Sequence, residues 1–142
     1  MEKSFYMNEA LKEARKAYEK GETPIGAVIV KDGEIISRAH NLTEELNDCT
    51  AHAEILAIRK ASEKLGGWRL INCDLYVTME PCIMCSGAIV QSRIKKVYFG
   101  AYEEKSGSAV SRFDILSSSG LNHKTEFLGG VKEEDCKKLL KD

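Results

Sequence analysis

The sequence has almost no excess of charge of either sign: 21 lysine and arginine residues stand against 22 aspartate and glutamate residues, which gives a net charge of −1. This balance excludes a broad electrostatic field that would attract a polyanion or an anionic membrane, so any nucleic-acid contact must come from a local patch. Long apolar runs are also missing. No stretch approaches the roughly 20 apolar residues that span a bilayer, and the N-terminal residues lack the apolar core of a signal peptide. We therefore expect a cytoplasmic protein with no membrane partner.

Repeats, low-complexity tracts and a domain linker are absent as well. The 142 residues match the length of one compact domain, which usually runs to roughly 100–200 residues. A content of 43% hydrophobic and 30% charged residues is ordinary for a globular protein. We expect a single domain over residues 1–142 whose core is stable without disulfides.

The cysteines are odd in number, and the chain has no export signal, so thiols or metal ligands are favoured over a disulfide framework. They are Cys49, Cys73, Cys82, Cys85 and Cys136. Cys73 precedes an expected strand and Cys136 lies on the apolar side of the last expected helix, settings typical of small buried side chains. Cys49 is close to His52 in sequence, and it is left open as either a neighbour of a site or a loop-packing residue.

The hydrophobic pattern predicts alternating helices and strands. Helices are expected over residues 4–20, 51–65, 81–92 and 131–140, and strands over 25–30, 34–39, 74–79, 96–101 and 124–128. Asp32-Gly33 is a hairpin turn signal between the first two strands. The apolar positions of the 51–65 helix (Ile55, Leu56, Ile58, Ala61 and Leu65) spread widely enough that we expect most of them to be buried. The order strand, helix, strand implies a parallel pair, and hence an α/β protein whose mixed sheet carries helices on both faces.

Two short motifs carry the chemistry. His52-Ala-Glu54 opens one helix and Pro81-Cys82-Ile-Met-Cys85 opens another. Cys82 and Cys85 are three residues apart, so they share a helix face and can occupy two corners of a tetrahedron. The positive end of a helix dipole stabilises the thiolates that bind metal, and His52 would be a neutral third ligand. Two thiolates and one imidazole suit Zn²⁺ and leave a fourth position for water, as in catalytic zinc sites.

Glu54 lies near the same helix start as His52, where a carboxylate can approach a zinc-bound water without replacing it. Zinc lowers the pKa of water to roughly 7, and a carboxylate can then take its proton and return it to a leaving group. Each signal alone has a plainer interpretation: a redox pair for Cys-x-x-Cys, a capping residue for His52, and dipole compensation for Glu54. Together they match the signature of zinc-dependent nucleobase deaminases, His-x-Glu followed by Pro-Cys-x-x-Cys.

Several further blocks accompany these motifs: residues 23–30, 51–55, 75–88, 92–94, 99–101 and 121–123, with Lys105-Ser-Gly107 and Asp114-Ile-Leu116. With them the sequence resembles, over nearly its whole length, the bacterial tRNA-specific adenosine deaminases of the cytidine deaminase-like superfamily. The resemblance implies a three-layer α/β/α fold with a five-stranded mixed sheet, one zinc per subunit, a homodimer, and conversion of adenosine to inosine at the anticodon wobble position of a tRNA. It assigns zinc binding to His52, Cys82 and Cys85, proton transfer to Glu54, and a base contact to Asn41.

The implied reaction begins when an unstacked adenine of the anticodon loop enters a pocket that we expect Ile25 and Val28 to wall. Glu54 would protonate N1 while zinc-bound hydroxide attacks C6, and would then deliver a proton to departing ammonia. An amide at Asn41 can offer both a donor and an acceptor to a purine edge.

The sequence departs from the family at its end, because it stops at Asp142 where the family continues into an aromatic and basic extension. We therefore expect part of the family's RNA-binding surface to be missing. Candidate replacements in and after the Ser- and Gly-rich segment are Lys105, Arg112, His123 and Lys124, with Glu103 at a loop position near the RNA. Scattered cations are equally typical of an ordinary solvated surface.

Two other functions remain open at this point. A deaminase of a free base or nucleoside (cytosine, guanine or cytidine) would keep the zinc chemistry and fit the near-neutral charge. A non-catalytic, zinc-stabilised binding protein would need a fourth protein ligand, for which Cys49 is the candidate, and would have no need for Glu54.

Overall fold

The structure is a computed structural model that describes residues 2–105, 107–109, 111, 114–116 and 123–141. The helices are α1 (Glu2–Glu19), α2 (Ala53–Leu65), α3 (Ile83–Gln91) and α4 (Glu133–Lys141). The strands are β1 (Gly26–Lys31), β2 (Glu34–His40), β3 (Cys73–Met79), β4 (Lys96–Ala101) and β5 (Glu126–Leu128). The kinds of element and their order are those predicted from the sequence.

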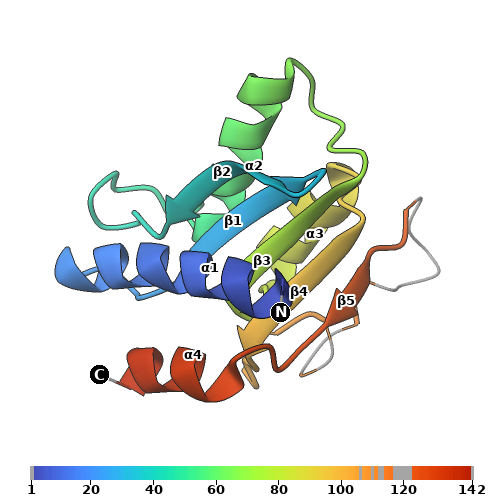
Figure 1. The fold of residues 1–142 in the computed structure, drawn as a ribbon. Helices are drawn as coiled ribbons and strands as arrows, with labels where there is room; N and C mark the ends of the chain where they lie inside the picture. Colours follow the sequence, from blue (N-terminus) through green and yellow to red (C-terminus); the bar gives the residue numbers. More distant parts are fainter. Residues whose placement is uncertain (1, 106, 110, 112–113, 117–122, 142) are drawn as a thin grey trace.

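The strands form one five-stranded sheet in the order β2-β1-β3-β4-β5. β1 runs antiparallel to β2 and to β3, whereas β4 is parallel to both β3 and β5. Helices α1 and α4 cover one face of the sheet, and α2 and α3 cover the other (Figure 1). The predicted three-layer α/β/α fold with a mixed sheet is confirmed.

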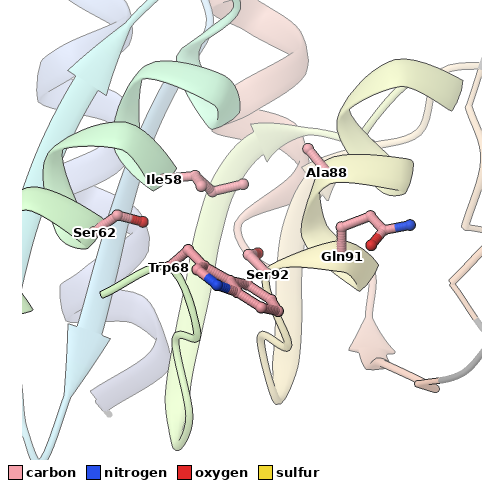
Figure 2. Close-up of a pocket in the computed structure, with 6 residues that line it drawn as sticks. All are labelled: Ile58, Ser62, Trp68, Ala88, Gln91 and Ser92. Atoms are coloured by element: carbon pink, nitrogen blue, oxygen red, sulfur yellow. The ribbon is translucent and has the colours of Figure 1, made fainter. Parts of the chain in front are cut away.

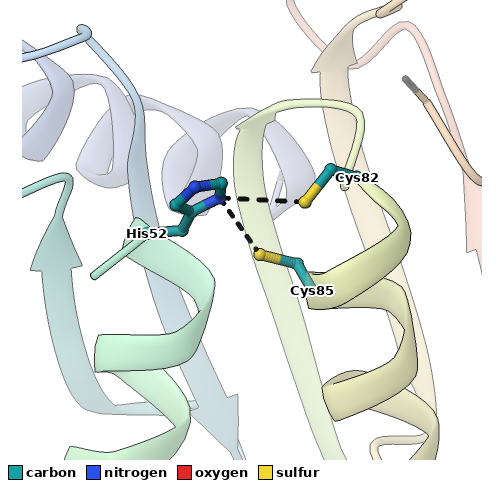
Figure 3. A group of neighbouring side chains, drawn as sticks. All are labelled: His52, Cys82 and Cys85. Carbon is teal, nitrogen blue, oxygen red and sulfur yellow. Dashed lines mark hydrogen bonds between the residues drawn. The ribbon is translucent and has the colours of Figure 1, made fainter. Parts of the chain in front are cut away.

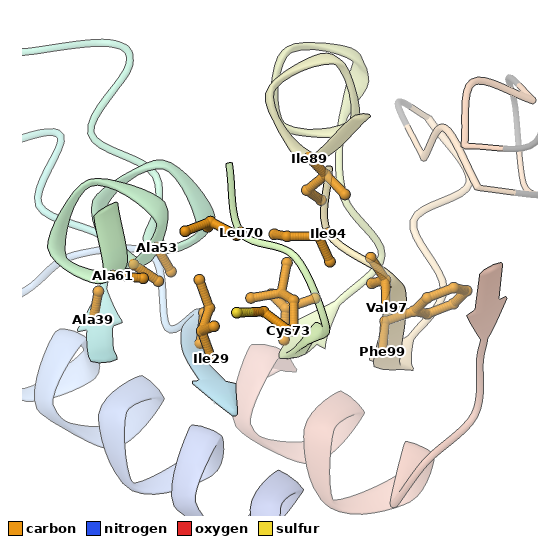
Figure 4. Packing of buried hydrophobic residues seen from close by; sticks show 14 of the residues in the cluster. Ile29, Ala39, Ala53, Ala61, Leu70, Cys73, Ile89, Ile94, Val97 and Phe99 are labelled. Carbon is orange, nitrogen blue, oxygen red and sulfur yellow. The ribbon is translucent and has the colours of Figure 1, made fainter. Parts of the chain in front are cut away.

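Alternation along the strands divides the core into two parts. Ala27 and Ile29 of β1 belong to the cluster beneath α2 and α3, where Ile29, Leu70 and Ile94 converge (Figure 4). Val28 and Val30 belong to the cluster beneath α1 and α4. Since neighbouring strand residues point to opposite faces, one strand serves both layers. Cys73 and Cys136 are buried, one in each cluster, as expected for packing residues.

Of the five apolar side chains of α2 expected to be mostly buried, only Ala61 is fully buried. The fully buried apolar residues of the helix are Ala53, Ala57 and Ala61, whereas Ile55, Leu56 and Ile58 are half-buried and Leu65 is exposed. The prediction of burial is therefore confirmed for Ala61 and wrong for the four larger side chains. The small methyl groups of alanine let the helix axis approach the sheet closely, and this brings the start of α2 near the start of α3.

The first strand pair is closed by a tight turn in which Asp32 and Gly33 have φ of 52° and 77°. Two successive positive φ values are typical of the hairpin turns that match strand twist, as the Asp-Gly pair predicted. Among the described residues, no helix has the length and apolar content needed to cross a membrane.

Candidate metal centre and catalytic pocket

The two motif helices begin beside each other at the carboxyl ends of the parallel strands. β3 ends at Met79, and Glu80-Pro81 leads directly into α3. Each helix starts two residues later than predicted, so His52 is the N-cap residue of α2 and Cys82 is the N-cap residue of α3. Both have extended backbone angles and no side-chain capping bond, which leaves their side chains free to serve another purpose.

His52, Cys82 and Cys85 form a compact cluster whose ligand atoms all lie within 4.8 Å of one another. His52 Nδ1 is 3.7 Å from Cys82 Sγ and 3.5 Å from Cys85 Sγ (Figure 3). In a tetrahedral zinc site with Zn–S of ~2.3 Å and Zn–N of ~2.05 Å, nitrogen and sulfur are about 3.6 Å apart. The side chains therefore have the spacing of three corners of a zinc tetrahedron.

The protonation of the two sulfur atoms differs. A hydrogen bond from the Cys85 thiol is the main cause that lowers the pKa of Cys82 to about 4; burial opposes it, and a smaller contribution from His52 adds to the lowering. The same bond to Cys82 raises the pKa of Cys85, and burial adds to this effect. The hydrogen bond with Cys82 also raises the pKa of His52. A divalent cation bound among these atoms would replace the shared proton, because the cysteines bind metal as thiolates.

Glu54 is buried in the first turn of α2, with 4% of its surface exposed. Burial raises the pKa of its carboxyl to about 7, and the nearby Cys82 thiolate adds to the increase. Its side chain also shares a hydrogen bond with Cys85. A carboxyl group that changes protonation near neutral pH beside a metal-binding site is typical of a general acid and base.

A cavity of about 280 Å³ opens beside the cluster. Its lining residues are Thr23, Ile25, Asn41, Thr43, His52, Glu54, Met79, Glu80, Cys82, Glu103 and Leu140. Ile25 lies in the wall as expected. Val28 does not, because it points to the opposite face of the sheet toward α1, so the prediction for Val28 is wrong.

Asn41 lines the same cavity as the metal-ligand side chains His52 and Cys82. It is 4% exposed, and its side-chain Oδ1 accepts the backbone N–H of Ala53 at 2.7 Å. The backbone N–H of Asn41 donates to the Ile25 carbonyl at 3.1 Å. Ala53 directly follows His52, so the amide oxygen helps to hold the start of α2. The side-chain amino group is the part of Asn41 that this contact leaves for a substrate.

Two buried carboxylates that the sequence patterns missed hold loops on either side of the cavity. Glu22 accepts the N–H groups of Glu44 at 3.0 Å and Glu45 at 2.7 Å. Glu80 does the same for the segment that follows β4, accepting the Glu103 N–H at 3.1 Å. The position of Glu80 directly before the Pro81-Cys82 motif could have drawn attention to it, whereas no motif accompanies Glu22.

The remaining expected site residues are dispersed. Cys49 is exposed and lies outside the metal-ligand cluster, and among the described residues no fourth protein ligand accompanies the three. Glu103 lines the cavity, and Lys105 is exposed two residues further on. His123 contacts the Ile94 carbonyl at 3.0 Å, near the amino end of β4, and Lys124 follows it. Those two residues therefore lie toward the end of the sheet opposite the cavity, and Arg112 is outside the described residues.

A second, larger cavity of about 440 Å³ lies between α2 and α3, away from the metal cluster. It is lined by Ile58, Ser62, Trp68, Ala88, Gln91 and Ser92 (Figure 2). The Trp68 ring covers one side of it and is 52% exposed. None of these residues belongs to the ligand cluster or lines the cavity beside it, so the groove lies outside the candidate catalytic site.

Comparison with known proteins relates the chain to zinc-binding deaminases. A family model described as the cytidine and deoxycytidylate deaminase zinc-binding region matches residues 1–101. The tRNA-specific adenosine deaminase of Bacillus subtilis (strain 168) is 53% identical over 95% of this chain and 84% of its own length. The protein of the same name from Aquifex aeolicus (strain VF5) is 56% identical over 89% of this chain and 84% of its own length.

Solved structures extend this similarity to the fold. A structure from a study of A-to-I editing by tRNA:A34 deaminases at the wobble position of transfer RNA has a TM-score of 0.92 and 47% identity, and the match covers 95% of this chain and 98% of that one. A guanine deaminase from Bacillus subtilis has a TM-score of 0.68 and 43% identity, with 78% of this chain and 70% of that one covered.

Proposed function

Because the chain belongs to the zinc-binding deaminase family and, within it, to the tRNA-specific adenosine deaminases, we propose that it hydrolyses adenosine to inosine at the wobble position of a tRNA anticodon. The observation that carries the proposal is the position of Glu54, buried beside a three-ligand cluster and lining a cavity. Three ligands suit catalysis because one position stays open, whereas an inert structural zinc site is closed by four.

His52, Cys82 and Cys85 hold the zinc ion in this proposal. Their spacing suits a tetrahedral ion, and the start of α3 favours negative charge on Cys82. When bound, zinc supplies a Lewis acid that lowers the pKa of a water molecule from about 15.7 to roughly 7.

Glu54 moves the protons. It takes a proton from the attacking water and gives one to N1 of the adenine ring as the C6–O bond forms. It then takes a second proton, from the new C6 hydroxyl group, and transfers it to the exocyclic amino group; the C6–N bond breaks and ammonia leaves, so adenosine and water become inosine and ammonia. A pKa of about 7 allows the carboxyl to exist in both forms at neutral pH, which this shuttle requires.

Asn41 and Ile25 receive the base. The Oδ1 of Asn41 already accepts the Ala53 N–H, so its amino group is the donor offered to an acceptor atom of the purine. Ile25 provides an apolar surface in the same cavity. The substrate is an unstacked adenine of an anticodon stem-loop, because a base inside a duplex cannot reach a cavity of this kind.

We also propose that the chain works as a homodimer in the cytoplasm, with one domain over residues 1–142. The apolar groove beside Trp68 and the half-exposed Ile83, next to Cys82, offer a surface that a second copy could cover. Burial of such side chains is the usual source of stability in homodimers. The tRNA named for the bacterial relatives supports the cytoplasmic location.

A second candidate is a deaminase of free guanine, which is favoured by the 43% identity to a guanine deaminase. Both candidates use the same cluster and the same carboxylate. They differ in whether the purine arrives free or as part of an RNA.

Replacement of Glu54 tests the mechanism. Glu54→Ala, loaded with zinc, should keep one zinc per chain and lose inosine formation in a wobble-adenosine stem-loop by at least about 10³-fold, since it lacks the proton carrier. Glu63→Ala, which removes an exposed carboxylate from the same helix, is the matched control and should react at the wild-type rate. Retained activity in Glu54→Ala would refute the role given to this residue.

A further inference from the structure

We propose that Glu80 is a positioning residue for the RNA substrate: its buried carboxylate ties Glu103, which forms part of the cavity wall, to Ala109 and Ser111 of the segment that follows. The inference rests on the proposed function, because it concerns how that cavity receives an RNA loop. Glu80 is 3% exposed and lies between Met79, the last residue of β3, and Pro81-Cys82. The group that holds the wall is therefore two residues from a proposed zinc ligand.

The two carboxylate oxygens draw together distant parts of the segment. Oε1 accepts the Glu103 N–H at 3.1 Å and the Ser111 hydroxyl proton. Oε2 accepts the N–H groups of Ala109 at 3.0 Å and Ser111 at 2.9 Å. Residues eight positions apart in the chain thus meet at one charged group, and hydrogen bonds to an ionised acceptor are stronger than neutral ones.

The middle of the segment fits closely around this carboxylate. Gly107 donates its N–H to the Glu103 carbonyl at 2.8 Å. A Cβ atom at Gly107 would lie 2.4 Å from the Glu80 Cδ and 2.4 Å from the Glu103 carbonyl oxygen, so only glycine allows this approach. Ser108 donates its N–H to the Pro81 carbonyl at 2.9 Å, and its hydroxyl group contacts Ser86 of α3.

These contacts join the wall to the cluster. Pro81 and Ser86 flank the turn that carries Cys82 and Cys85, so the segment is fixed to the same structure that positions the sulfur atoms. Glu103 lines the cavity, and Lys105 is exposed beside it. A base held in the cavity has flanking nucleotides that must pass over the rim. The position of this wall should therefore affect RNA binding more than the chemical step.

The test compares zinc-loaded Glu80→Gln with Glu104→Gln. Both remove one negative charge, but Glu104 is exposed on the same segment. For a wobble-adenosine stem-loop, we expect Glu80→Gln to raise KM about tenfold while kcat stays within about threefold and zinc content is unchanged. Glu104→Gln should match the wild type. A fall in kcat with unchanged KM, or wild-type kinetics in Glu80→Gln, would overturn the proposal.

A milder variant keeps the test valid if Glu80→Gln folds poorly. Ser111→Ala removes only the hydroxyl donor to Oε1, and we expect it to raise KM about threefold with kcat unchanged. Wild-type kinetics in both folded variants would refute the positioning role.

Limited trypsin digestion separates this proposal from the proposed function. Cleavage after Lys105 should be about tenfold faster in Glu80→Gln than in the wild type or Glu104→Gln, because the segment loses its anchor. Faster cleavage together with a wild-type protein that forms no inosine would refute the proposed function and leave the anchor established. Equal cleavage rates together with normal wild-type deamination would refute the anchor alone.

Discussion

Asn41 should have two separable roles, one in stability and one in substrate binding. Its Oδ1 accepts the Ala53 N–H at 2.7 Å, and Ala53 is fully buried at the start of α2. Asn41→Ala leaves that N–H without this acceptor, which costs about 1–3 kcal/mol of unfolding free energy. At about 4 °C per kcal/mol for a chain of this size, the melting temperature should fall by about 4–12 °C.

Asn41→Asp is the matched comparison, because it keeps an acceptor oxygen and removes the amino group. The positive end of the α2 dipole favours a carboxylate there, so the melting temperature should change by less than about 2 °C. Deamination of the stem-loop should nevertheless fall in both variants, because both lack the donor to the base. Thermal unfolding of the zinc-loaded proteins and an inosine assay provide the two readouts. Equal losses of melting temperature in the two variants would refute the assignment of Oδ1 to helix stability.

Three other predictions concern packing, acid stability and salt. Gly26→Ala would place a Cβ 2.1 Å from the Ala10 carbonyl oxygen of α1, so denaturant unfolding should reveal a loss of about 3 kcal/mol; a loss below about 1 kcal/mol would contradict the close contact. Burial raises the pKa of Glu13, but hydrogen bonds with Lys16 and His40 outweigh it and lower that pKa below 4.5. The ionised Glu13 therefore stabilises the fold above pH 4.5, and this stabilisation is lost as pH falls through the lowered pKa of the folded state. The free energy of unfolding of Glu13→Gln should therefore fall less on acidification than that of the wild type. Equal losses in the two proteins would refute the ion pairing. RNA affinity should depend weakly on salt, and the steep slope of a protein with roughly 6–10 phosphate contacts would contradict loop-directed binding.

The metal-ligand side chains could be predicted because each motif that supplies them is only a few residues long. His52-x-Glu54 and Pro81-Cys82-x-x-Cys85 each lie at one helix start, so short spacings fixed which side chains share a face. The order of strands and helices then brought the two starts together. A site whose residues lie two or three positions apart can be inferred from the sequence without knowledge of the tertiary packing.

The walls of the cavity could not be predicted in the same way. The bonds of Glu80 to Glu103, Ala109 and Ser111 span 23 to 31 positions, and no periodic pattern in the sequence marks these partners. Val28 faces α1 and not the cavity, because each step of one residue along a strand reverses the face on which the side chain lies. Which face of α2 packs on the sheet also depends on both surfaces in contact, so the hydrophobic pattern of the helix alone does not identify Ala53 and Ala57 as its buried residues.

The choice of substrate is the most direct test of whether the protein deaminates the wobble adenosine of a tRNA. The zinc-loaded protein should be incubated with an anticodon stem-loop that carries adenosine at the wobble position and, in parallel, with free adenosine, cytosine and guanine, and the products should be identified by mass spectrometry. We expect inosine in the stem-loop and no conversion of the free compounds. Deamination of a free base or nucleoside while the stem-loop stays intact would contradict this expectation.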